Sequence, residues 1–225
     1  MEPRPGLHPE PCINGQVAAI GAYFGQDVRG IVARLLAEQL VDGGWNCEAE
    51  NGSVRSSFKT TICVLEALLE YERAGGADPT VSEARRRGED YLLERRLFRR
   101  RSTGEAIERD RKGGADWTRF AFPTWWHYDV LRALEHLRRA GARPDGRAAE
   151  AVARVASRRG TDGRWSLEAR HPGTMPVEFD AGEGRPNHGI RSAPCACSAG
   201  TSKPVGRAGS CVHGPNRGGM QHVPG

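Results

Sequence analysis

The sequence predicts an all-α fold built as an incomplete array of helix pairs. Apolar residues recur three and four positions apart in several segments, which is the period of an amphipathic helix. Two motifs also repeat: residues 65–75 match 131–141 at an interval of 66, and residues 42–45 match 162–165 at an interval of 120. Such intervals are typical of stacked helix pairs. No segment shows the convincing apolar–polar alternation of a strand.

The first half of the chain should hold three helices, over residues 14–24, 28–40 and about 57–73. Asp27 is a suitable N-cap for the second helix, and Ser56 or Ser57 for the third. The third helix is apolar over much of its circumference, so we expect it to be buried.

The second half should hold three more helices, over residues 79–97, 123–140 and 146–158. Asp78 followed by Pro79 supplies an N-cap and a favourable first helical residue. Asp145 caps the last helix. The arginine-rich stretch 95–119 stands where a middle copy of the tryptophan motif would fall.

Composition restricts the class of protein. The 225 residues fit one domain, or at most two small ones. They contain no run of about 18 apolar residues, so we expect no transmembrane helix. The start of the chain has no apolar signal-peptide segment, which favours a cytoplasmic location. Peripheral contact with a membrane and the oligomeric state stay open.

Net charge argues against a nucleic-acid partner. The formal charge of +5 arises mostly in residues 188–225, which hold four basic and no acidic residues. The rest of the chain has 29 basic against 28 acidic residues and is close to neutral.

The last 38 residues differ in kind from the rest. They contain 8 Gly and 4 Pro but no Leu, Phe, Trp or Tyr, so we expect disorder there. We therefore divide the chain into a flexible N-terminus (1–12), a helical domain (13–187) and a disordered tail (188–225). A frame-shifted reading of a lost helix is one hypothesis for the origin of the tail. The cysteine spacing within it does not match a standard zinc finger.

The loop that ends at Trp45 carries a family resemblance. Gln39, Gly43 and Trp45 resemble the QW motif of squalene–hopene and oxidosqualene cyclases, and the loop is similar to those of protein prenyltransferase β-subunits. Gly163 and Trp165 follow the same pattern without the glutamine. The resemblance covers about residues 13–187. It implies a partial α/α toroid whose concave centre holds an isoprenoid.

The departures from that family concern its chemistry. The Asp-x-Asp-Asp acid of the triterpene cyclases is missing, and no Asp-x-Cys stands before a helix to supply a prenyltransferase zinc site. We therefore expect no metal and no cofactor. Whether the chain is an enzyme stays open.

The densest candidate site is the aromatic segment 122–129. Phe122, Trp125, Trp126 and Tyr128 are candidate ligand-binding residues for an apolar molecule. His127 and Asp129, which follow in the same segment, are candidate proton-transfer residues. Core packing of these side chains is the competing interpretation.

Two carboxylates that follow the tryptophan loops are further catalytic candidates, Glu48 after Trp45 and Asp180 after Trp165. A carboxylate that faces an aromatic cavity could act as a general acid if burial raised its pKa. The competing interpretation is a solvated turn.

The arginine run over residues 95–101 is a candidate for contact with a diphosphate headgroup. Acidic neighbours in the sequence favour a solvated surface instead. Cys47 and Cys63 are interpreted as reduced thiols, while Cys12 is left unassigned.

The function that these residues favour is the binding or processing of a polyprenyl or terpenoid-like ligand in an aromatic cavity. The alternative is a non-catalytic helical-repeat interaction protein that kept the fold and lost the chemistry.

Overall fold

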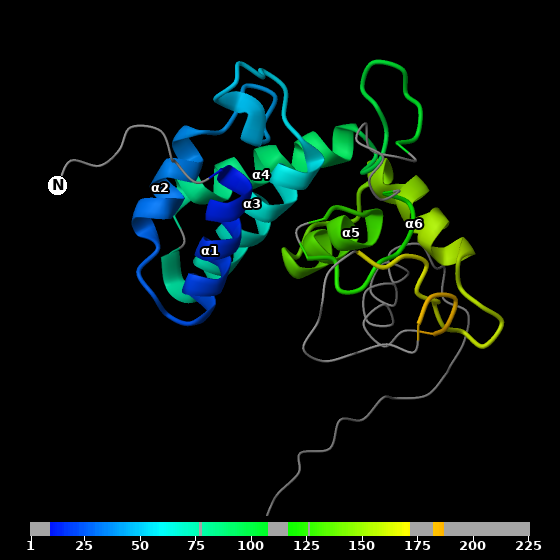
Figure 1. Ribbon diagram of the computed structural model, residues 1–225. Helices are drawn as coiled ribbons and strands as arrows, with labels where there is room; N and C mark the ends of the chain where they lie inside the picture. Colours follow the sequence, from blue (N-terminus) through cyan, green and yellow to red (C-terminus); the bar gives the residue numbers. More distant parts are fainter. Residues whose placement is uncertain (1–9, 77, 108–116, 126, 172–181, 187–225) are drawn as a thin grey trace, which may run out of the picture.

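The computed structural model describes residues 10–76, 78–107, 117–125, 127–171 and 182–186. The fold is all-α, as predicted, and these residues contain no strand, only isolated bridges. The helices are α1 (Pro11–Tyr23), α2 (Arg29–Ala37), α3 (Phe58–Tyr71), α4 (Pro79–Glu94), α5 (Val130–Arg139) and α6 (Ala149–Ser157). In Figure 1, α1 to α4 are grouped together and α5 lies between this group and α6.

Several predicted caps are confirmed. The Ser57 side chain accepts a hydrogen bond from the backbone N–H of Thr60 at the start of α3, and Asp78 accepts from Thr80 and Val81 at the start of α4. The Asp145 side chain caps the short 3₁₀ helix Gly146–Ala148 (η3), which leads into α6.

The predicted start of α5 at Pro123 is wrong, because the helix begins at Val130. Asp129 is its N-cap, with a carboxylate oxygen 2.7 Å from the backbone nitrogen of Arg132. Upstream, Trp125 has a φ of 51°, which an α-helix does not accommodate, and the N–H of His127 turns back to the carbonyl of Thr124. A side-chain cap and a left-handed residue therefore delay the helix by about two turns.

Small residues let α1 approach α3 closely. A Cβ atom added at Gly15 would lie 2.7 Å from the carbonyl oxygen of Cys63. Ala18 and Ala22 continue this buried face of α1, while α3 is buried on most sides, as predicted. The close contact places the first turn of α1 beside the loop that follows Trp45.

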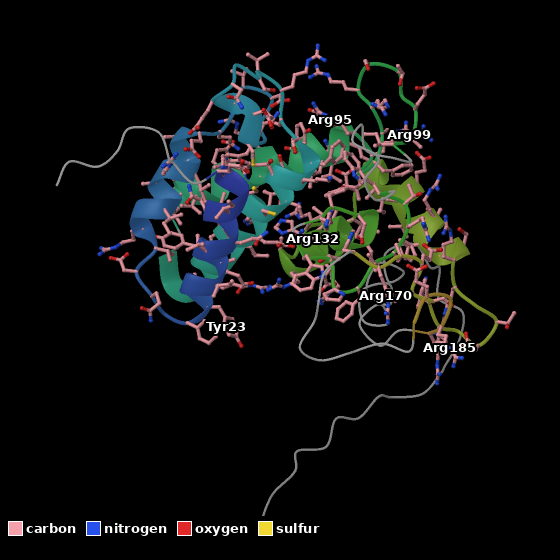
Figure 2. The ribbon with its side chains drawn as sticks, viewed as in Figure 1. Tyr23, Arg95, Arg99, Arg132, Arg170 and Arg185 are labelled. Atoms are coloured by element: carbon pink, nitrogen blue, oxygen red, sulfur yellow. The ribbon has the colours of Figure 1, made fainter. Side chains whose placement is uncertain are left out.

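The 66-residue repeat is also a spatial relationship, because α3 and α5 are neighbours. Glu66 and Arg132, 66 residues apart, form a two-pronged ion pair with N–O distances of 2.8 and 2.6 Å. Arg73 donates to the carbonyl of Arg139 at the same interval. Figure 2 shows Arg132 between the two helices.

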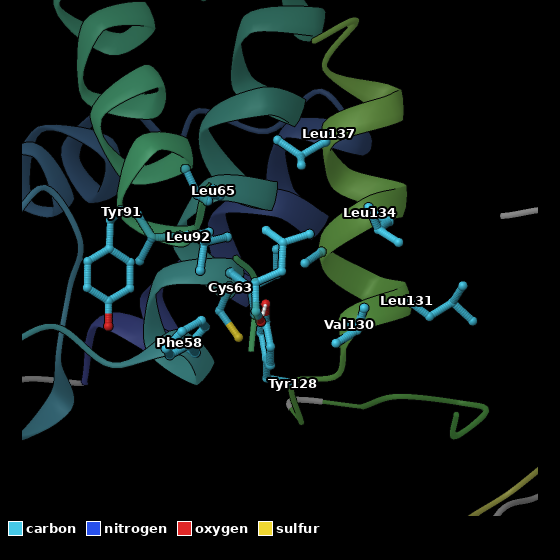
Figure 3. Close-up of a cluster of buried hydrophobic side chains, with 14 of the residues drawn as sticks. Phe58, Cys63, Leu65, Tyr91, Leu92, Tyr128, Val130, Leu131, Leu134 and Leu137 are labelled. Carbon is cyan, nitrogen blue, oxygen red and sulfur yellow. Dashed lines mark hydrogen bonds between the residues drawn. The ribbon is translucent and has the colours of Figure 1, made fainter. Parts of the chain in front are cut away.

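The core extends through α3, α4 and α5. Figure 3 shows Leu65, Leu92 and Leu134 among these helices, with Phe58 and Tyr128 at one end of the cluster. A buried polar contact lies beside the core, because the Nε2 atom of His136 on α5 lies 3.0 Å from a carboxylate oxygen of Glu89 on α4. A hydrogen bond of this kind lowers the cost of burying the two groups.

Pro11 and Cys12, which the sequence assigned to a flexible N-terminus, are the first residues of α1. The predicted tail, 188–225, lies outside the described residues. Among the helices that the structure describes, none has the length and apolar character needed to cross a bilayer.

Candidate ligand-binding site

The two tryptophan loops have the same local structure. The indole N–H of Trp45 donates to the carbonyl of Leu35 at 2.6 Å, and that of Trp165 donates to the carbonyl of Val155 at 2.7 Å. Both side chains are buried, with exposed fractions of 0% and 5%, which confirms the predicted burial. Gly43 and Gly163 each have positive φ, so each loop turns where a glycine permits it.

Gln39 fixes the first loop in two directions. Its amide nitrogen donates to the carbonyl of Gly43 at 2.7 Å and to the carbonyl of Ala84 on α4 at 2.8 Å. In the second loop Arg159 donates to the carbonyl of Gly163 at 2.8 Å. Arg159 stands 120 residues after Gln39, so it takes over the glutamine's bond within the loop. Alignment of the two motifs at their interval of 120 residues places Arg159 opposite Gln39. This correspondence was not predicted from the sequence because the residue there is an arginine and not a glutamine.

The predicted aromatic wall is not a single surface. Tyr128 is 1% exposed and its hydroxyl donates to the carbonyl of Leu97, whereas Trp125 is 41% exposed and Phe122 is partly buried. The predicted helix over residues 123–140 therefore does not carry Trp125 and Tyr128, because both precede Val130, where α5 begins. Trp126 lies outside the described residues.

Asp129 and His127 lie in different surroundings. Asp129 is buried, and burial raises the pKa of its carboxyl group to about 6 despite the hydrogen bonds from backbone N–H groups. The His127 ring stacks on His171 with centroids 3.7 Å apart. Burial, together with His127 and Lys59, lowers the pKa of His171 to about 4.

Of the two carboxylates proposed after the tryptophan loops, Glu48 lies in the described part of the chain. Glu48 is exposed, in the short 3₁₀ helix Cys47–Ala49 (η1), and accepts a hydrogen bond from Asn51 at 2.9 Å. Asp180 lies outside the described residues.

A cleft of about 720 Å³ lies at the N-terminal end of α3 and the C-terminal end of α4. Its apolar lining comes from Phe58, Tyr91, Ile107 and Trp117. Phe58 packs against the other two rings, with centroids 5.6 Å from Tyr91 and 4.8 Å from Trp117. This volume is in the usual range for a small-molecule site. The rings come from three separate parts of the chain, which is why no sequence motif marked them as a group.

The rest of the lining is polar and mostly cationic. Its charged residues are Asp42, Arg55, Lys59, Arg95, Arg100 and Arg101. Three serines, Ser56, Ser57 and Ser102, also line the cleft. Among the described lining residues, five cations stand against one carboxylate and give this part of the cleft a positive potential, which attracts anions.

Arg96 and Arg99 differ from Arg100 and Arg101 in the acidic partners that they reach. Arg96 and Arg99 reach Glu150 on α6, an acidic partner distant in sequence. Within the part of the chain that the structure describes, Arg100 and Arg101 form no ion pair. We expected acidic residues nearby in sequence to neutralise the arginine run. Among the described residues, none pairs with Arg100 or Arg101.

The backbone turns the arginine run toward the cleft. Arg96 and Leu97 have φ values of 48° and 66°, and the fully buried side chains of Leu97 and Phe98 anchor the turn. Left-handed conformations are unfavourable for such residues, so packing must maintain them. Figure 2 shows Arg95 and Arg99 on either side of this turn.

Arg95 connects the cationic and aromatic parts of the cleft. Its guanidinium lies 3.8 Å from the centroid of the Tyr91 ring, donates to the Tyr91 carbonyl and lies 3.5 Å from Asp42. Figure 3 shows the Tyr91 hydroxyl pointing toward the end of the core occupied by Phe58 and Tyr128.

Donors suited to a metal ion converge elsewhere, at Glu10, Cys12 and Cys47, whose ligand atoms lie within 4.8 Å of one another. Comparison with known proteins does not assign either place, because no family model, curated protein or solved structure matches the chain.

Proposed function

We propose that the protein binds a polyprenyl or terpenoid-like molecule with an anionic headgroup in the cleft of about 720 Å³. The apolar chain would contact Phe58, Tyr91 and Trp117, and the headgroup would lie among the arginines. The observation that carries this proposal is the lining itself, in which rings and cations share one cleft.

Aromatic rings account for the apolar part of the ligand. They offer large, rigid surfaces to a branched hydrocarbon, and burial of that hydrocarbon contributes about 25 cal/mol per Å². Ring faces also stabilise a carbocation that develops on an isoprenoid. The aromatic lining thus suits both binding and a reaction of such a ligand.

Arginines account for the headgroup. The planar guanidinium makes two parallel hydrogen bonds to phosphate oxygens, and this geometry favours arginine over lysine. Arg100 and Arg101 are suited to this role because carboxylate partners do not occupy them in the described part of the chain. The hydroxyl of Ser102, which also lines the cleft, adds a neutral donor.

Processing of the ligand would use His127 for proton transfer. Its ring stacks on His171, and Lys59, which lines the cleft, is close enough to oppose protonation of His171. Asp129 is the less suitable candidate because its carboxylate caps α5. We therefore place the proposed chemistry on the Lys59 side of the cleft.

The second candidate function is a non-catalytic helical-repeat interaction protein. The observation in its favour is a row of exposed apolar residues on α1, formed by Ile13, Val17, Ile20 and Phe24. Their exposed fractions are 50–69%, and their spacing places them on one face of the helix and its C-cap. A protein with this function alone would not distinguish a prenyl diphosphate from other amphiphiles.

Titration calorimetry separates the two functions. Farnesyl diphosphate, farnesol and inorganic diphosphate are titrated into the wild-type protein and the R100A/R101A variant. We expect the variant to bind farnesyl diphosphate at least tenfold more weakly, with little change for farnesol. The R143A/R164A variant removes the same charge from exposed loops and should bind as the wild type does. Equal binding by all three proteins, or no binding by the wild type, would contradict the proposal.

A further inference from the structure

Two cysteines from distant parts of the chain meet beside the first tryptophan loop. The sulfur atoms of Cys12 and Cys47 lie 3.1 Å apart although the residues are 35 positions apart in sequence. This distance is shorter than an ordinary contact between two sulfur atoms, yet longer than the 2.05 Å of a disulfide bond. Both residues are free cysteines and both are partly exposed.

Packing of the backbone produces this encounter. Cys12 is in the first turn of α1, which the small-residue face holds against α3. Cys47 begins η1, immediately after the buried Trp45 and the capping residue Asn46. The oxygen of Thr60 on α3 lies 3.3 Å from the Cys47 sulfur and contacts it from a third element.

The two thiols have unequal acidity. The hydrogen bond between the two sulfur atoms lowers the pKa of Cys47 to about 7, and it outweighs the effect of burial. The same bond, burial and the charge of Cys47 raise the pKa of Cys12, and Glu10 and Cys63 act in the same direction. The Cys12 sulfur also lies 3.5 Å from the carboxylate of Glu10, whereas the other neighbour of the Cys47 sulfur is the neutral hydroxyl of Thr60, so we assign the first attack to Cys47.

We propose that Cys12 and Cys47 form a redox-active dithiol that exchanges with small disulfides and closes into an intramolecular disulfide. The Cys47 thiolate attacks one sulfur of a disulfide RSSR, forms a Cys47–SR bond and releases RS⁻. Cys12 then loses its proton to solvent and attacks the Cys47 sulfur, which releases the second RS⁻. The pair loses two electrons, and RSSR gains them.

The geometry supports the second step in particular. Cys12 is already next to the sulfur that it must attack, because the two sulfur atoms lie 3.1 Å apart before any rearrangement. The resulting bond would join the first turn of α1 to η1.

Cys63 provides an internal comparison. It is 1% exposed on α3, and burial raises the pKa of its thiol. It should therefore react slowly with small disulfides. If Cys47 reacts faster than Cys63 with a small disulfide, the difference reflects the surroundings of Cys47 and not a general reactivity of thiols in this chain.

Peptide mapping of the full chain tests the proposal. Trypsin places Cys12 in residues 1–29, Cys47 in 35–55 and Cys63 in 60–73. After incubation with glutathione disulfide and alkylation of the remaining thiols, we expect the first two peptides to be joined and the third to be alkylated. In C12S, glutathione should accumulate on Cys47, whereas C63S should behave as the wild type does.

The contradicting results are equally specific. Persistence of glutathione on Cys47 in the wild type, a bond from Cys47 to any other cysteine, or failure of Cys47 to react would each overturn the proposal. The wild-type experiment needs no substitution, so an effect of a variant on folding does not remove the test.

Discussion

Trp45 and Trp165 are equivalent residues 120 positions apart, since each indole N–H donates to the backbone carbonyl ten residues before it. The same correspondence places Arg159 in the loop-closing role of Gln39. The repeat is therefore a repeat of hydrogen bonds as well as of residues. Each of these bonds joins a loop to the helix before it, so the loops contribute to the stability of the helix pairs.

Substitution of Trp45 by alanine should destabilise the protein by about 3–5 kcal/mol, because it removes a fully buried ring and the bond to Leu35. Urea denaturation of the variant measures this loss. Trp125→Ala is the matched control, because that ring is 41% exposed, and its effect should be much smaller. An unchanged midpoint for Trp45→Ala would refute the structural role of the motif.

The two loop-closing residues should differ in importance. Gln39→Ala should cost about 1–3 kcal/mol, since it breaks bonds to two carbonyls and one of them belongs to α4. Arg159 is exposed and bonds within its own loop, so Arg159→Gln should change stability by no more than about 0.5 kcal/mol. Thermal unfolding of both variants provides the comparison. A larger loss in Arg159→Gln would contradict the assignment.

Much of the helical layout was readable from the sequence because caps are local. Ser57 and Asp78 lie next to the helices that they begin, and each side chain bonds within three residues. The start of α5 was predicted wrongly because proline is common at the first position of a helix, which favoured Pro123. The left-handed Trp125 stands between Pro123 and the helix. Asp129 was the better indication of the helix start.

The candidate site was harder to predict. Phe58, Tyr91 and Trp117 share no motif, and only the packing of α3, α4 and the later loop brings them together. The partner of Arg99 is likewise Glu150, 51 residues away. The acidic residues near Arg99 in sequence therefore did not identify this partner.

Asp129 should make stability depend on pH in an unusual direction. Its folded-state pKa of about 6 exceeds the unfolded value near 3.9, so its contribution is fully present below about pH 4 and is lost as the pH rises through 6. Asp129→Asn keeps a capping oxygen without the charge. We expect the stability of this variant, relative to that of the wild type, to increase as the pH rises from 4 to 8.

Asp129→Ala is the control for the cap, and it should lose about 1 kcal/mol at pH 4. Urea denaturation at pH 4 and pH 8 measures both variants. A stability difference between wild type and Asp129→Asn that does not vary with pH would contradict the raised pKa.

Glu89 should have the opposite pH dependence. Burial raises its pKa, but His136 and Arg85 outweigh burial and lower it overall. Its stabilising contribution is therefore present above the unfolded pKa, near 4.3, and is lost as the pH falls through the lower folded value. Glu89→Ala should cost about 3–5 kcal/mol at pH 7, because the mostly buried Arg85 loses one of its carboxylate partners and His136 loses its hydrogen bond.

Glu83→Ala, on the same helix, is the control. Glu83 pairs with Arg86 at the surface, where both side chains are more than half exposed, so the loss should be at most about 1 kcal/mol. Equal losses for the two variants in denaturation at pH 7 would show that the buried pair has no special role.

Mass spectrometry of lipid that co-purifies with the protein is the most direct test of the proposed ligand. The wild type and R143A/R164A should both retain an isoprenoid that carries a phosphate-type headgroup, and R100A/R101A should lose most of it. The same lipid profile in all three proteins, or no isoprenoid with the wild type, would contradict a cleft that recognises a prenyl anion.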